Sequence, residues 1–119
     1  MTPARGEIWI CQLVKEYGKT RPCVVIQSPE IESGSVLMVP LTNGNLQPWR
    51  VAIPPNADNG LLEAGRDREP VAMTEKVQPV HPKRIRVRIG RLAASILAEL
   101  DEKLCIVQSL MCSGHGERK

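Results

Sequence analysis

Two polar side chains at the ends of apolar segments are the strongest candidates for chemistry in this sequence. Arg21 stands at the start of one such segment, and Thr42 ends another, just before the turn-favouring pair Asn43-Gly44. A guanidinium is a planar, permanently charged donor that suits two phosphate oxygens at once. A threonine hydroxyl can hydrogen-bond the same phosphate or a developing oxyanion. The two residues therefore suit chemistry at a phosphate, while a solvated arginine and a plain turn threonine are the ordinary alternatives.

Signatures of other enzyme classes fail in this sequence. Gly18-Lys19-Thr20 looks like the end of a phosphate-binding P-loop, but that motif requires another glycine at the position of Leu13. No HExxH, GxSxG or GxGxxG pattern occurs. The four cysteines are Cys11, Cys23, Cys105 and Cys112. They form no C-x-x-C pair, and the two histidines are too scattered to complete a zinc pattern, so we expect reduced thiols and no metal or other cofactor.

The composition is that of a small globular protein. The 119 residues are 42% hydrophobic and 24% charged, which allows one modest core and is too short for two domains. We expect a single domain over residues 1–112 and a flexible tail over residues 113–119. No apolar run approaches the roughly 18 residues of a membrane span and no secretory signal is present, so the expected location is the cytoplasm. The net charge of +3 suits a polyanionic partner without requiring one.

Short apolar runs separated by Gly and Pro predict a mainly β protein. Runs rich in Ile, Val and Trp predict strands over residues 7–13, 21–27, 36–41, 49–53 and 71–77, the first two as a hairpin. Residues 56–70 have the composition of a mobile, solvent-facing loop. Apolar residues at spacings of three and four predict the only convincing helix, over residues 94–111. Many short strands followed by one terminal helix favour a small barrel or a strongly curved sheet.

A basic segment before the helix alternates arginine with aliphatic residues. Its members are Arg84, Ile85, Arg86, Val87, Arg88 and Ile89. Side chains two apart share a face of an extended segment, so the guanidinium groups are expected on one side and the aliphatic groups in the core. Together with Arg91, the row suits contacts along a nucleic-acid backbone, and a solvated strand face is the alternative.

Four short motifs, taken in order, give the sequence a family resemblance. They are Arg5-Gly6-Glu7-Ile8-Trp9, Lys19-Thr20-Arg21-Pro22-Cys23-Val24-Val25, Val39-Pro40-Leu41-Thr42 and Ile89-Gly90-Arg91-Leu92. The series resembles the MazF/PemK family of toxin endoribonucleases from type II toxin-antitoxin systems, from about Arg5 to about Val107. The resemblance implies a mainly β fold with a C-terminal helix, an SH3-like small barrel of the CcdB/PemK type, assembled as a homodimer.

The resemblance also implies an activity and its partners. The activity is sequence-selective, metal-independent cleavage of single-stranded RNA such as mRNA, by attack of the 2′-hydroxyl, leaving a 2′,3′-cyclic phosphate and a 5′-hydroxyl. Such a reaction needs charge stabilisation at phosphorus and proton transfer but no cofactor, because the substrate supplies its own nucleophile. A cognate antitoxin protein neutralises toxins of this family by laying an extended acidic tail over the RNA site.

The family's active-site positions can be carried over to this chain. The arginine before proline and the threonine of the P-L-T element correspond to Arg21 and Thr42, and Glu75 takes the place of the family's acidic or polar residue. Relatives often carry Asp-Gln where this chain has Glu75-Lys76, so a surface ion pair is the alternative for Glu75. The candidate RNA-binding residues are Lys19, Tyr17, Trp49, Lys76, Arg84 and Arg86. Tyr17 and Trp49 are the candidates for base stacking.

Two other functions remain open on the same barrel. A CcdB-like gyrase-poisoning toxin acts by binding an enzyme rather than by catalysis. That family depends on an aromatic residue near the C-terminus, and no aromatic residue follows Trp49 here. The other alternative is a non-catalytic barrel that binds a peptide or a nucleic acid.

Overall fold

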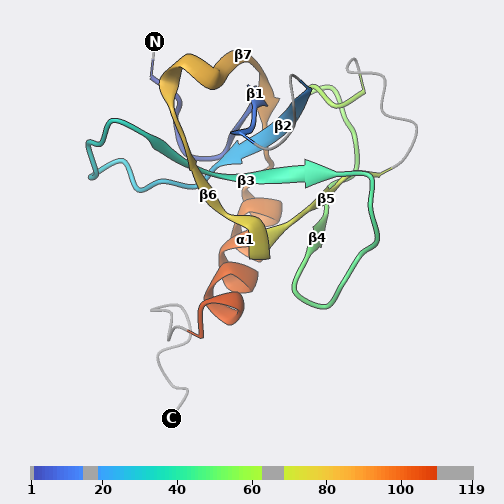
Figure 1. The fold of residues 1–119 in the computed structure, drawn as a ribbon. Helices are drawn as coiled ribbons and strands as arrows, with labels where there is room; N and C mark the ends of the chain where they lie inside the picture. The colour runs from blue at the N-terminus through green and yellow to red at the C-terminus, as the bar shows by residue number, and fades with distance from the viewer. Residues whose placement is uncertain (1, 15–18, 63–68, 110–119) are drawn as a thin grey trace.

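The computed structural model describes residues 2–14, 19–62 and 69–109, which form a curved set of strands and one long helix (Figure 1). The described elements are strands β1 (Glu7–Gln12), β2 (Thr20–Val25), β3 (Val36–Thr42), β4 (Val51–Ala52) and β5 (Val71–Ala72), the 3-10 helix η2 (Thr74–Lys76), strand β6 (Gln78–Val80), the 3-10 helix η3 (Pro82–Arg84), strand β7 (Ile85–Arg91) and helix α1 (Ala94–Val107). The protein is mainly β with an α-helix after the last strand, as the sequence predicted.

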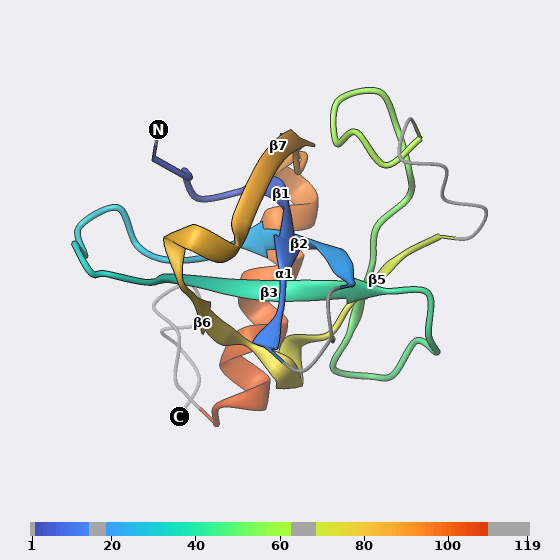
Figure 2. The same ribbon diagram turned by 45° about the horizontal axis from the view of Figure 1, so that its top comes forward.

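The strands pair in the order β4-β5-β3-β2-β1-β7, and β6 pairs with β3 beside that path. Every pairing is antiparallel. Figure 2 shows β7 next to β1 toward the top of the view and β5 at the right, near the end of β3. Among the described residues β4 and β7 do not pair with each other, so the sheet stays open and the predicted barrel is not closed.

The larger apolar core lies between α1 and one face of the sheet. Leu100 and Leu104 of the helix belong to the same buried cluster as Ile8, Val24 and Val39 of the first three strands. The helical residues are four apart and therefore share one face of α1. Burying each of these aliphatic side chains stabilises the fold by roughly 1.5–3 kcal/mol. This packing attaches α1 to the strands that carry the candidate site.

A second apolar core covers the opposite face of the same strands. Trp9, Cys11 and Met38 are buried there together with Ile85. Because successive strand residues point to opposite faces, Ile8 and Trp9 belong to different cores although they are neighbours in the chain. A strand buried on both faces is apolar at almost every position, which is why these strands are continuous apolar runs in the sequence.

The segment predicted as a strand over residues 71–77 is a strand only at its start. After β5 the chain turns into η2 and then enters β6. The buried hydroxyl of Thr74 in η2 donates a hydrogen bond to the carbonyl of Trp49, which lies far away in the sequence. The strand predicted over residues 49–53 is likewise shortened to β4, because Trp49 lies in the preceding loop. Both predicted strands are therefore shorter in the structure, and the bond between Thr74 and Trp49 joins the non-strand parts of the two segments.

The predicted alternation along β7 is also interrupted. Two β-bulges shift its register against β1. Ile85 is 8% exposed as predicted, whereas Val87 is 53% exposed, so the prediction that Val87 enters the core is wrong. A bulge adds a residue to one strand and redirects the side chains that follow it.

The loop predicted over residues 56–70 is solvent-facing only in part. Asn59 is 2% exposed, its Oδ1 accepts hydrogen bonds from two backbone N–H groups at 3.0 Å each, and its Nδ2 donates to the carbonyl of Pro54 at 2.9 Å. The prediction of a solvent-facing loop is therefore wrong for residues 59–61, which are buried, whereas residues 56–58 and 62 are exposed. Residues 63–68 lie outside the described part. The polar composition of the segment did not indicate that the side-chain amide of Asn59 is buried and hydrogen-bonded to the surrounding backbone.

Helix α1 ends at Val107, earlier than predicted, and residues 110–119, with the predicted tail, lie outside the described residues. Cys11 and Cys23 are buried and are not disulfide-bonded. Cys105 is disulfide-bonded, so the prediction of a reduced thiol is wrong there. Spacing in the sequence does not show which sulfur atoms the fold brings within bonding distance. No helix in the described residues is long and apolar enough to cross a membrane.

Candidate active site

The pairing of β2 with β3 brings Arg21 and Thr42 together. In this antiparallel register Cys23 faces Pro40. The same register, continued toward the start of β2, sets Arg21 across from Thr42. Nη1 of Arg21 donates a hydrogen bond to the carbonyl of Leu41 at 3.0 Å, which anchors the guanidinium beside the end of β3. Two residues that are distant in the sequence therefore meet at one edge of the hairpin.

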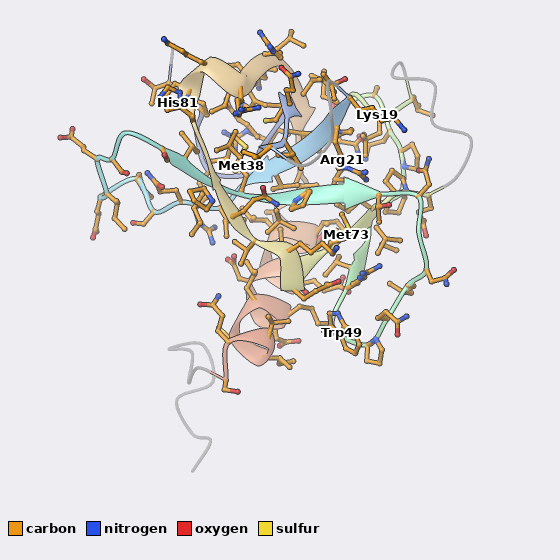
Figure 3. The ribbon with its side chains drawn as sticks, in the orientation of Figure 1. Lys19, Arg21, Met38, Trp49, Met73 and His81 are labelled. Carbon is orange, nitrogen blue, oxygen red and sulfur yellow. The ribbon has the colours of Figure 1, made fainter. Side chains whose placement is uncertain are left out.

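Arg21 and Thr42 both line an open pocket of about 630 Å³. The lining residues are Leu13, Val14, Arg21, Pro40, Thr42, Met73, Lys76, Val77 and Gln78. Figure 3 shows Arg21 and Met73 on opposite sides of β3 near its end. Arg21 and Lys76 bring positive charge to the pocket, and none of its described lining residues is a carboxylate. An apolar wall with a few polar groups is typical of a ligand site, and the charge favours an anionic ligand.

The turn after β3 fixes the hydroxyl of Thr42. Oγ1 of Thr42 accepts a hydrogen bond from the backbone N–H of Gly44 at 3.2 Å. A hydroxyl that accepts one bond keeps its own proton for donation to a ligand. Thr42 and Arg21 are both half-buried, so each keeps access to the pocket while its position is restrained. Together they offer a neutral and a charged hydrogen-bond donor to an anion.

Glu75 lies beside this pocket and is not among its lining residues. Nε of Arg50 is 3.2 Å from each carboxylate oxygen of Glu75, and Nε1 of Trp49 is 3.0 Å from Oε1. The hydrogen bond from Arg50 is the main cause that lowers the pKa of Glu75, and the bond from Trp49 adds to it, against the opposing effect of burial. The structure thus holds an ionised carboxylate in an ion pair next to the site.

The other predicted site residues are distributed around the pocket. Lys76 lines it. Lys19 is exposed just before β2, and Trp49 is 37% exposed with its indole N–H bound to Glu75. Tyr17 lies outside the described residues.

The two remaining candidates lie toward β7. Arg84 lines a second, smaller hollow of about 150 Å³. Arg86 donates a hydrogen bond to Oε1 of Gln12. The structure therefore gathers Arg21, Thr42 and Lys76 in one pocket, and Arg84 and Arg86 are not among its lining residues.

Sequence reasoning missed Met73 and Gln78, both of which line the pocket. Met73 lies in the segment 71–77 that the sequence predicted to be one strand, and Gln78 follows that segment as the first residue of β6. Only their closeness to Glu75-Lys76 indicated a role. Among the described residues no three His, Cys, Asp or Glu side chains are grouped so that they could hold a metal ion.

A family model described as "PemK-like, MazF-like toxin of type II toxin-antitoxin system" matches residues 4–108. The chain belongs to the PemK/MazF toxin family. The matched residues include Arg21, Thr42 and the whole of α1, so the resemblance seen in the motifs is confirmed. None of the curated proteins matches the chain.

Solved structures of other proteins share the fold of this PemK/MazF family member. A mycobacterial endoribonuclease in complex with its cognate antitoxin has 16% sequence identity and a TM-score of 0.74, with 93% of this chain and 99% of that chain covered. The toxin MazF-mt6 of Mycobacterium tuberculosis has 22% identity and a TM-score of 0.70, with 89% and 99% covered. A MazE-MazF structure from Deinococcus radiodurans has 18% identity and a TM-score of 0.72, with 93% and 99% covered. At these identities the likeness shows the fold.

Proposed function

We propose that this toxin is an endoribonuclease that cuts single-stranded RNA, mRNA included, at selected sequences and without a metal ion. The observation that carries the proposal is that Arg21 and Thr42 line one open, positively charged pocket together with Lys76. A phosphodiester and its more highly charged transition state are the ligands that these groups suit. Membership of the PemK/MazF family supports the same activity.

The chemistry is transfer of the phosphoryl group to the neighbouring 2′-hydroxyl of the RNA. The 2′-hydroxyl gives up its proton as its oxygen attacks phosphorus, the bond to the 5′-oxygen of the next nucleotide breaks, and that leaving oxygen takes up a proton, so no proton is gained or lost overall. The products are a 2′,3′-cyclic phosphate and a 5′-hydroxyl. Arg21 and Lys76 offset the charge that grows on the non-bridging oxygens, and Thr42 donates a hydrogen bond to one of them. Charge stabilisation in a fixed geometry is often the largest single contribution to catalysis.

An antitoxin is the proposed protein partner. The family is defined by toxin-antitoxin systems, and one protein of similar fold was solved with its cognate antitoxin. Arg21 and Lys76 would attract an acidic, extended antitoxin segment to the pocket. No carboxylate among the described lining residues would repel it. The cytoplasm as the location and a homodimer as the assembly belong to the same proposal.

Cleavage of a defined single-stranded RNA in the presence of EDTA tests the activity. Wild-type protein is expected to cut, and mapping of the ends is expected to give a cyclic phosphate and a 5′-hydroxyl. Arg21→Ala and Thr42→Val are expected to lose at least about a hundredfold in rate. Thr42→Ser is the matched control, because it keeps the hydroxyl and should retain most of the activity.

The two alternative functions give different results in the same assay. A CcdB-like toxin would leave the RNA intact and inhibit gyrase instead. A non-catalytic barrel would bind the RNA without cutting it. RNA that stays whole after prolonged incubation with wild-type protein therefore refutes the nuclease proposal.

A further inference from the structure

A second, smaller hollow adjoins the pocket of Arg21 and Thr42. It has a volume of about 150 Å³. Its lining residues are Gln12, Leu13, Val14, Ser35, Gln78, Pro79, Val80, His81 and Arg84. Leu13, Val14 and Gln78 line both hollows, so the two hollows adjoin at these shared side chains. We call the two adjoining hollows together the track, which extends from Arg21 past Gln78 to Arg84.

Arg84 differs from the other arginines of this region in what its side chain contacts. The side chains of Arg86, Arg88 and Arg91 bind Gln12, Glu7 and the carbonyl of Arg5, respectively. Arg84 is the last residue of η3, and its half-buried side chain has no hydrogen bond or ion pair within the described parts of the chain. A half-buried guanidinium without a protein partner favours an anionic ligand, because its charge and donors are otherwise only partly solvated.

The rest of the track has the polarity expected for a nucleotide chain. No carboxylate is among the described residues that line either hollow. Nε2 of Gln78 donates to the carbonyl of Lys76 at 3.1 Å, which orients the amide at the boundary between the hollows. Its second N–H and its Oε1 have no partner among the described residues, and this donor and acceptor pair is what an unpaired base edge requires. Leu13 and Val14 give the same boundary an apolar surface.

We propose that the smaller hollow is the subsite for the nucleotide next to the cleaved linkage, with Arg84 as the ligand of its phosphate. Gln78 contacts a base at the boundary and thereby contributes to sequence selectivity. This inference rests on the proposed function and deepens it, since it extends the RNA site along one defined direction from Arg21.

The first test compares RNAs of different length. After the cleavage site has been mapped, the substrate is trimmed one nucleotide at a time from each end. Arg84→Gln is expected to lower the ratio of kcat/KM for the long RNA to kcat/KM for the shortest cleavable RNA by roughly tenfold. Lys83→Gln is the matched control, because it removes the same charge from an adjacent exposed residue that lines neither hollow, and it should keep the wild-type ratio.

The second test measures binding without cleavage. The probe is the long oligonucleotide with a 2′-deoxy sugar at the cleaved position, titrated at several salt concentrations. Loss of one phosphate contact in Arg84→Gln is expected to reduce the slope of log K against log salt concentration by about 0.7, and Lys83→Gln should not change it. Circular dichroism of both variants shows whether the fold is retained.

The outcomes separate this inference from the proposed function. If wild-type protein cuts RNA and Arg84→Gln matches Lys83→Gln in both tests, the subsite is refuted and the nuclease stands. If wild-type protein binds the probe through Arg84 without cutting any RNA, the subsite stands and the nuclease is refuted. If it neither binds nor cuts, both are refuted.

Discussion

The guanidinium of Arg50 binds the carboxylate of Glu75 with Nε 3.2 Å from each oxygen. Nη1 of the same arginine donates to the carbonyl of Asn45 at 3.1 Å. Asn45 lies shortly after Thr42, and Glu75 lies in η2 next to Lys76. Arg50 therefore connects the two segments that carry polar groups of the pocket. This arrangement favours a supporting role for Glu75 over a direct one.

We expect Glu75→Gln to lower RNA cleavage by about tenfold or less, because the amide keeps the shape of the side chain but loses the charge-assisted bonds from Arg50. The pH dependence of kcat/KM should keep its wild-type shape. Glu99→Gln, at an exposed position of α1, is the control and should be neutral. A loss as large as that of Arg21→Ala, with the acidic limb of the pH profile gone, would instead make Glu75 the proton acceptor.

The lowered pKa of Glu75 predicts a dependence of stability on acid pH. The hydrogen bond from Arg50 is the largest cause of this lowering from the ordinary value of 4.5. A carboxyl group whose pKa is lower in the folded state stabilises the fold fully above its unfolded pKa. That contribution is lost as the pH falls through the lower, folded pKa.

Urea unfolding at neutral pH and below pH 4.5 measures this loss. Glu75→Gln removes the titrating group, so its midpoint should fall less on acidification than that of the wild type. Equal falls in the two proteins would show that the Arg50 bond does not contribute to acid sensitivity.

Among the glycines that the structure describes, Gly60 is the one at which an added side chain has the least room. Its φ is +75°, and a Cβ there would lie 2.0 Å from the carbonyl oxygen of Ile89. We expect Gly60→Ala to destabilise the fold by about 2–4 kcal/mol, from backbone strain and from displacement of β7. Gly34→Ala is the matched control, because a Cβ at Gly34 meets nothing within 4 Å, and it should be neutral within about 0.5 kcal/mol. Equal unfolding midpoints for the two variants would contradict the close approach.

The buried hydroxyl of Thr74 supports the loop that contains Trp49 and Arg50. Thr74→Val keeps the shape of the side chain and removes the donor to the Trp49 carbonyl, so we expect a loss of about 1–2 kcal/mol in the free energy of unfolding. Thr20→Val, at an exposed position of β2, is the control and should change the stability little. Denaturant unfolding measures the stability of both variants. An equal stability of Thr74→Val and Thr20→Val would contradict the supporting role of the Thr74 hydroxyl.

The closeness of Arg21 to Thr42 could be predicted because the two residues belong to apolar runs that follow one another in the sequence. Each residue lies at one end of an apolar run, and consecutive strands usually lie side by side in a sheet, as β2 and β3 do across the connection of residues 26–35. The apolar character of β1, β2 and β3 was equally clear, since both faces of these strands are buried. The position of the site follows from these two features.

The features that the sequence did not show depend on contacts between distant segments. The turn at η2 is supported by a bond from Thr74 to Trp49, and Gly60 packs against the backbone of Ile89. Neither contact leaves a periodic pattern in the chain. The exposure of Val87 has the same origin, because it follows from bulges in the pairing with β1. Propensity and periodicity describe single segments, so they do not report such contacts.

The bulged strand β7 also limits how another chain can join this protein. It stands at one end of the sheet, with exposed arginines along it and a register that is twice interrupted. Regular strand addition needs an unbroken row of free backbone groups, and bulges and like charges disfavour it. β7 is therefore a poor template for edge-to-edge aggregation, and an incoming peptide is directed to side-chain contacts rather than to extension of the sheet.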